Sequence, residues 1–198
     1  MRILALDPSS SCVGYAVLTG LEPAELIDGG LIKPSQAKRV TADLPPWLSE
    51  RLRAKPLRAV HGIYAITATV DDLIAEHAPA TIVVEVPSGK AGTGSRQQRA
   101  GGGLTTLGLA AGAVLERCRH AATAIDAHDP PAVVPVTERQ WTSRRSGPGA
   151  RGPKYQSQAA IAALYRGRYD PAADPGADLA DAIALARWWL QRDHAVSA

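Results

Sequence analysis

Short apolar runs separated by turn sequences limit the possible folds of this chain more than any other feature of its sequence. Residues 2–7 and 13–18 are two such runs, rich in Ile, Val and Leu, and the turn-forming segment 8–11 (PSSS) separates them. Runs of this length bounded by turn residues are typical of β-strands, so the pattern predicts two strands joined by a tight turn. A third strand is predicted over residues 25–32. The chain is therefore expected to begin with three antiparallel strands.

Helical and strand patterns alternate in the rest of the chain. Apolar positions recur every three or four residues in the segments predicted as helices, and short continuous apolar runs mark the strands. The predicted segments are a helix from residue 57 to Pro79, a strand over 81–86, a helix over 104–118, a strand over 132–136, and helices over about 155–165 and from near 175–176 to about 191. Hairpin and strand-helix-strand connections together predict an α/β fold, a mixed β-sheet in which parallel strands follow the antiparallel ones, with helices on both faces.

Composition narrows the classes of protein that this chain can belong to. It has 198 residues, 45% of them apolar and 21% charged, which predicts one domain over residues 1–198. Cys12 and Cys118 lack the spacing of a zinc site and are too few for a disulfide framework. No apolar run reaches about eighteen residues, and the N-terminal run is too short for a signal peptide. We therefore expect a soluble, cytoplasmic protein with no membrane association.

Two acidic residues stand at the ends of predicted strands. Asp7 closes the first apolar run, and Glu85 closes the run that begins at residue 81. Strand ends are where open α/β sheets place their chemistry, and burying an unpaired carboxylate costs several kcal/mol. A structural alternative stays open for each acid: Asp7 capping the turn that follows it, and Glu85 pairing with Arg96 or Arg99.

A further pair of acids, Asp178 and Asp181, lies near the start of the last predicted helix. Their spacing places both on one helical face, and interaction with the helix dipole is the structural alternative. That alternative does not explain why three distant segments each present acids at a buried edge. With Asp7 and Glu85 they form an oxygen-only ligand set that suits Mg²⁺ or Mn²⁺. Two such ions about 4 Å apart activate a water and stabilise the leaving oxygen of a phosphodiester.

Basic residues are concentrated in one part of the chain. The net charge is +3, but residues 87–154 hold ten Lys and Arg against four Asp and Glu, whereas the rest of the chain has a net charge of −3. The excess lies in and around two Gly-rich stretches, 87–103 and 143–154, which are predicted to be loops. This distribution predicts a basic surface for a polyanion around an acidic centre.

Four motifs resemble the RuvC-type Holliday junction resolvases of the RNase H-like superfamily. They are residues 3–17 (ILALDPSSSCVGYAV), 82–85 (IVVE), 107–114 (LGLAAGAV) and 178–182 (DLADA). The first motif is shared with the actin and sugar-kinase folds, whereas the strand-end Glu and the C-terminal DxxDA make the set more specific. The resemblance spans nearly the whole chain, and the motifs follow the order of the family.

The resemblance implies an RNase H-like fold and a homodimeric crossover junction endodeoxyribonuclease. Such an enzyme nicks two strands of a four-way DNA junction symmetrically and leaves 5′-phosphate and 3′-hydroxyl ends. Asp7, Glu85, Asp178 and Asp181 match the catalytic acids that hold the two Mg²⁺ ions of the family, for which Mn²⁺ is expected to substitute. Lys154 is similar to the basic catalytic residue that follows a Gly-rich segment and approaches the DNA.

Two departures from the family concern DNA recognition. Ser9 replaces a glycine common in cellular members, which resembles phage-type relatives. The aromatic wedge of the cellular members is missing, because no aromatic residue lies between Glu85 and Trp141. Contacts to the DNA backbone are expected instead, which favours recognition of shape over base sequence. The expected DNA-binding residues are Lys90, Arg96, Arg99, Arg144, Arg145, Arg151 and Lys154.

Two other functions remain as alternatives. One is a non-catalytic dimer that binds branched DNA, although a site that only binds a polyanion would gain by losing four acids. The other is an ATPase or kinase of the actin-like fold, which uses a similar strand-end Asp. Such proteins need a second phosphate loop and an adenosine motif, and neither is found in this sequence. No nucleotide cofactor is therefore expected.

Overall fold

The computed structural model describes residues 1–9, 12–20, 24–33, 58–87, 103–124, 130–142 and 154–197. Its strands are β1 (Arg2–Pro8), β2 (Val13–Thr19), β3 (Glu25–Ile32), β4 (Thr81–Val86) and β5 (Ala132–Thr137). Its helices are α2 (Arg58–His77), α4 (Gly103–Ala124), α5 (Glu138–Thr142), α6 (Lys154–Leu164), the 3₁₀ turn η4 (Pro171–Ala173) and α7 (Asp178–Ser197). No helix among these residues is both long and apolar enough to cross a membrane.

The five strands form one mixed sheet in the order β3-β2-β1-β4-β5. The pairs β1–β2 and β2–β3 are antiparallel, as the short connections between the apolar runs predicted. The pairs β1–β4 and β4–β5 are parallel, because each connection between them contains a helix. The predicted α/β fold with a mixed sheet is therefore confirmed.

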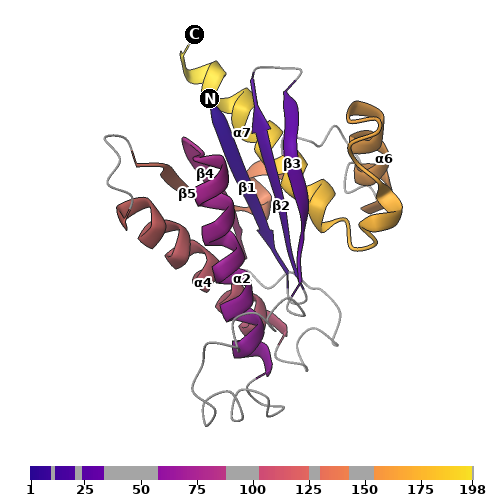
Figure 1. Cartoon of the computed structure of the whole chain (residues 1–198). Helices are drawn as coiled ribbons and strands as arrows, with labels where there is room; N and C mark the ends of the chain where they lie inside the picture. Colours follow the sequence, from indigo (N-terminus) through magenta and orange to yellow (C-terminus); the bar gives the residue numbers. More distant parts are fainter. Residues whose placement is uncertain are drawn as a thin grey trace.

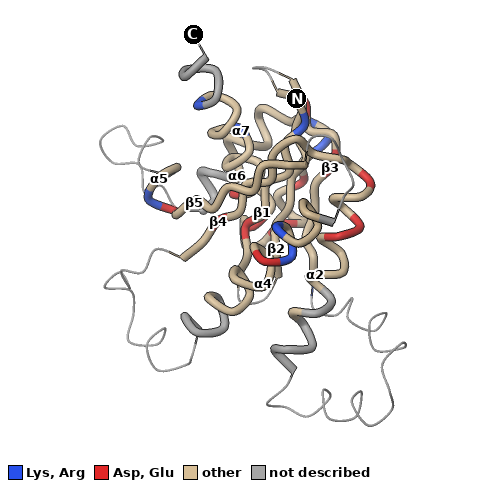
Figure 2. The backbone as a smooth tube through the Cα atoms, turned by 90° about the vertical axis from the view of Figure 1, so that its left-hand side faces the viewer, with Lys and Arg blue, Asp and Glu red and all other residues tan. Residues whose placement is uncertain are grey.

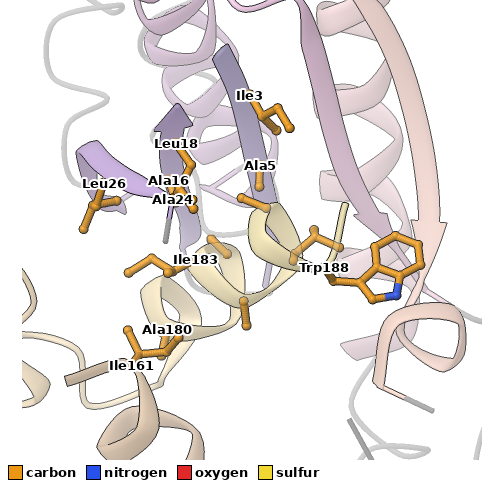
Figure 3. Close-up of a cluster of buried hydrophobic side chains, with 14 of the residues drawn as sticks. Ile3, Ala5, Ala16, Leu18, Ala24, Leu26, Ile161, Ala180, Ile183 and Trp188 are labelled. Atoms are coloured by element: carbon orange, nitrogen blue, oxygen red, sulfur yellow. The ribbon is translucent and has the colours of Figure 1, made fainter. Parts of the chain in front are cut away.

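Alternating side chains of the strands supply two hydrophobic clusters on opposite faces of the sheet. Leu4 and Leu6 of β1 belong to the cluster that includes residues of α2 and α4. Ile3 and Ala5 of the same strand belong to the cluster that includes residues of α6 and α7. Figure 1 shows α2 in front of the sheet and α7 behind it, and Figure 3 shows the packing on the α7 face. Helices thus cover both faces, as the sequence predicted.

Helix boundaries differ from the sequence prediction in several places. Helix α4 continues to Ala124, six residues beyond the predicted end, because Ala121 and Ala122 still pack against the core. The short elements α5 and η4 were not predicted, and five or three residues are too few to show helical periodicity. Helix α7 begins at Asp178, slightly later than predicted, and extends to Ser197.

Candidate active site

The two strand-end acids lie side by side on the face of the sheet that α7 covers. Side chains two residues apart on a strand lie on the same face, so Asp7 lies on the face of Ala5 and Glu85 on the face of Val83. Ala5 and Val83 belong to the hydrophobic cluster that includes α7. The parallel register pairs Leu6 with Val84, so its next step sets Asp7 beside Glu85. Both acids are half-buried. Asp7 and Glu85 therefore lie near the ends of neighbouring strands, as the apolar runs predicted, and their role at a functional site stays a prediction.

Gly14 brings the start of α7 next to Asp7. It pairs with Asp7 in the β1–β2 ladder. A Cβ atom on Gly14 would overlap the main-chain carbonyl of Asp178 and would lie 2.9 Å from the nitrogen of Leu179. The first turn of α7 therefore rests directly on β2, one strand from Asp7. Asp178 and Asp181 occupy that turn, and both are half-buried.

Two side chains that the sequence analysis did not assign to the site contact its acids. The indole N–H of Trp141, in α5, donates a hydrogen bond of 2.7 Å to Oε2 of Glu85. The thiol of Cys12 donates one of 3.1 Å to Oδ2 of Asp178. The contact between Trp141 and Glu85 could have been predicted, because Trp141 follows β5 at the end of the sheet where Glu85 lies. Cys12 and Asp178 are 166 positions apart, and nothing in the sequence pairs them.

The turn between β1 and β2 holds Cys12 in place. The main-chain nitrogen of Ser9 donates to the carbonyl of Cys12 at 2.8 Å. The nitrogen of Cys12 donates in return to the hydroxyl oxygen of Ser9 at 3.1 Å. Ser9 therefore links the end of β1 to Cys12, which precedes β2, through its side chain.

A fifth acid, Asp174, lies beneath the start of α7 and is 0% exposed. Its carboxylate accepts hydrogen bonds from the hydroxyl of Tyr169 and from main-chain N–H groups of α7. Burial, with the hydrogen bond to Asp174, raises the pKa of the Tyr169 hydroxyl well above its usual range. The sequence analysis missed Asp174, although an Asp immediately before the helix start predicted near residues 175–176 is a helix-start signal.

The four predicted acids fit a hard divalent cation by their donor chemistry, since all their side-chain ligands are oxygens. Three segments of the chain bring them to one face of the sheet. Within the part of the chain that the structure describes, however, no three His, Cys, Asp or Glu residues form a group that could hold a metal ion. One oxygen of Glu85 accepts a hydrogen bond from Trp141, and one oxygen of Asp178 accepts a hydrogen bond from Cys12.

The predicted DNA-binding residues cannot be placed with the acids. Six of them lie outside the described residues: Lys90, Arg96, Arg99, Arg144, Arg145 and Arg151. The alternative pairing of Glu85 with Arg96 or Arg99 lies there too. Lys154 is the first residue of α6, and its side chain is not among those described. In Figure 2 the described Lys and Arg positions are scattered over separate elements, so the predicted basic surface stays a prediction.

Comparison with known proteins identifies the fold. No protein-family model and no curated protein sequence matches this chain. It is similar to Thermus thermophilus RuvC in complex with a Holliday junction substrate, with a TM-score of 0.57 and 17% identity, and to a second structure of that RuvC, at 0.56 and 19%. Each alignment covers 95% of this chain and 92% of the other. This chain has an RNase H-like fold.

A eukaryotic structure gives the same result. The yeast mitochondrial Holliday junction resolvase Ydc2 aligns with a TM-score of 0.52 and 10% identity, over 96% of this chain and 77% of that one. The RNase H-like mixed sheet expected from the sequence motifs is thus confirmed. Membership of a phage-type group stays a prediction.

Proposed function

We propose that this chain is a metal-dependent endonuclease that resolves four-way DNA junctions by paired, symmetric nicks. The observation that supports the proposal is that Asp7 and Glu85 end neighbouring strands of an RNase H-like sheet, and that the helix turn carrying Asp178 and Asp181 packs against Gly14, the β2 partner of Asp7. The solved structures with this fold include a RuvC bound to a Holliday junction, which supports branched DNA as the substrate class. A homodimer is part of the proposal, because two symmetric nicks need two sites.

The proposed metal ligands are Asp7, Glu85, Asp178 and Asp181. Bound Mg²⁺ or Mn²⁺, with two ions per site, would activate the attacking water and stabilise the leaving oxygen. The sheet holds two of these carboxylates and the first turn of α7 holds the other two, so the DNA backbone would approach where the ends of β1 and β4 meet the start of α7. Attack forms a bond from the water oxygen to phosphorus and breaks the bond to O3′, which leaves 5′-phosphate and 3′-hydroxyl ends.

Basic residues of the chain have a separate role in this proposal. Lys154 begins α6, and α6 packs against the helix that carries two of the acids. We assign Lys154 to a DNA phosphate near the reacting bond. The other predicted DNA-binding residues would neutralise further phosphates of the junction arms, which gives affinity without reading bases. They are Lys90, Arg96, Arg99, Arg144, Arg145 and Arg151.

Cleavage of a labelled four-way junction tests the proposed function. With Mg²⁺, the wild-type chain is expected to give paired nicks at symmetric positions, and linear duplex of the same sequence is expected to stay intact. Asp7→Asn should abolish cleavage and retain junction binding. Asp72→Asn is the matched control, because Asp72 is an exposed acid of α2, the helix on the other face of the sheet, and this change should leave cleavage intact.

Each alternative predicts a different result in that experiment. Junction binding by the wild-type chain with no nick under Mg²⁺ or Mn²⁺ would favour the non-catalytic dimer. Cleavage without divalent metal, or full activity of Asp7→Asn, would refute the metal assignment. A rise in melting temperature with ATP would favour the actin-like ATPase or kinase.

A further inference from the structure

Asp174 is the most deeply buried acid among the described residues, and it lies outside the proposed ligand set. Its Oδ2 atom accepts from the hydroxyl of Tyr169 at 2.9 Å and from the nitrogen of Ala180 at 2.9 Å. Its Oδ1 atom accepts from the nitrogen of Leu179 at 3.2 Å. A fully buried carboxylate is costly unless such donors offset the loss of water. Both oxygens are therefore committed to holding neighbouring groups.

The groups that Asp174 holds define the first turn of α7. The first N–H groups of a helix have no partner within the helix, and Leu179 and Ala180 supply two of them. The main-chain carbonyl of Asp174 adds two more contacts, from the nitrogen of Ala177 at 3.1 Å and from the side-chain amide of Gln158 in α6. Asp174 thus joins α6, the segment before α7 and α7 itself.

The backbone just before the acids adopts a conformation that needs such support. Ala177 has a φ of +62°, a left-handed conformation that residues with a Cβ atom seldom adopt. It is also fully buried, and its carbonyl accepts the hydrogen bond from the nitrogen of Asp181 at 2.9 Å. Ala177 therefore connects Asp174 to both Asp178, the next residue, and Asp181, one turn further on.

We propose that Asp174 is a positioning residue of the acidic site: its carboxylate fixes the first turn of α7 and thereby the places of Asp178 and Asp181. Asp174 is not proposed as a metal ligand, because its oxygens are already occupied by hydrogen-bond donors. The inference rests on the proposed function, in which these two acids bind metal. Positioning groups behind metal ligands typically change metal affinity by about tenfold or more.

Asp174→Asn tests this role, because it keeps the side-chain volume but places an N–H₂ group against one of the donors. We expect Mn²⁺ affinity, measured by calorimetry on the full chain without DNA, to fall about tenfold. We also expect the amides of Leu179 and Ala180 to exchange with solvent at least about tenfold faster, measured by NMR below the melting temperature. Tyr169→Phe removes one donor and should give a smaller change in both readouts, which covers the case in which the first variant does not fold.

Asp170→Asn is the matched control. Asp170 is exposed in the same loop, and its side chain caps η4 by accepting from the nitrogen of Ala172. This variant removes the same charge but keeps a side-chain oxygen that can cap η4, and it should leave Mn²⁺ affinity and the two amides of α7 unchanged. Weaker Mn²⁺ binding with unchanged exchange in Asp174→Asn would show a charge effect alone and would overturn the proposal.

Faster amide exchange with unchanged Mn²⁺ affinity in Asp174→Asn would also overturn the proposal, because Asp174 would then only cap the helix. Failure of the proposed function gives a different result: wild-type chain that binds no Mn²⁺, or Asp7→Asn that binds it as tightly as wild type. In that case the inference fails together with the proposal on which it rests.

Discussion

Gly14 is the residue on which the start of α7 rests, and its lack of a side chain is required there. We expect Gly14→Ala to lower the free energy of unfolding by about 1–3 kcal/mol, because the new Cβ would overlap the main chain at Asp178. Gly112→Ala is the matched control. A Cβ at Gly112 of α4 meets nothing within 4 Å in the structure, so the change should stabilise the chain by about 0.5–1 kcal/mol. Urea unfolding measures both, and equal stability of the two variants would refute the argument.

Trp141 is a second residue whose contribution can be isolated. Trp141→Phe keeps most of the packing and removes the hydrogen bond to Glu85, so we expect unfolding to become easier by about 1 kcal/mol. Under the proposed function, cleavage should fall too. Trp189→Phe is the comparison, because the indole N–H of Trp189 is buried and has no hydrogen-bond partner in the described part of the chain. Equal losses in the two variants would mean that the bond to Glu85 contributes nothing measurable.

At the scale of elements, one ion pair joins the two helices on the face opposite α7. Nε of Arg117 in α4 donates to both carboxylate oxygens of Asp71 in α2, at 2.6 and 2.7 Å. Both side chains are partly exposed, so solvent screens the pair. A double-mutant cycle with Asp71→Asn and Arg117→Gln should give a coupling energy of about 0.5–1 kcal/mol that shrinks at high salt.

The control for that cycle pairs Asp71→Asn with Arg119→Gln. Arg119 is an exposed arginine two positions further along α4, so its coupling to Asp71 should be close to zero. Coupling energies of the same size in the two cycles would mean that long-range charge, and not the contact between α2 and α4, is being measured.

At the scale of the whole molecule, the strands and helices were predictable because each leaves a repeated pattern in the sequence. Single side-chain contacts leave no such pattern and were not predicted. Short apolar runs were sufficient to predict the five strands of the described residues, and the connections between them predicted helices on both faces of the sheet. Strand-end placement identified Asp7 and Glu85, because the sheet itself determines where such residues lie. Asp174 was missed because its role depends on backbone that bends at Ala177, and no local pattern signals that bend. Cys12 was missed because its partner is remote in sequence.

Among the described residues, three groups with a raised pKa set the response to alkaline pH: Tyr169, beside Asp174, and two groups in the face that α2 and α4 cover. Burial raises the pKa of the Cys118 thiol from 9.0 to about 12. Burial, followed by the influence of Asp28, raises the pKa of Tyr15 from 10.0 to about 12, and its hydroxyl donates to Oδ2 of Asp28 at 3.3 Å. Nε2 of His77 lies 3.1 Å from the same oxygen. The folded chain therefore keeps three protons in a pH range where the unfolded chain releases them.

Stability must consequently fall as the pH rises from about 9 to 12, because the unfolded state binds fewer protons than the folded state in that window. Each retained proton lowers the folding equilibrium constant by up to about tenfold per pH unit. Urea unfolding at successive pH values between 8 and 11 should show this slope, and below about pH 8 the three groups should contribute almost none of it. Tyr15→Phe and Cys118→Ala should each remove about one proton from the slope, whatever they do to stability at neutral pH. If neither substitution changes the dependence of unfolding free energy on pH, other groups in the molecule cause the loss of stability at alkaline pH.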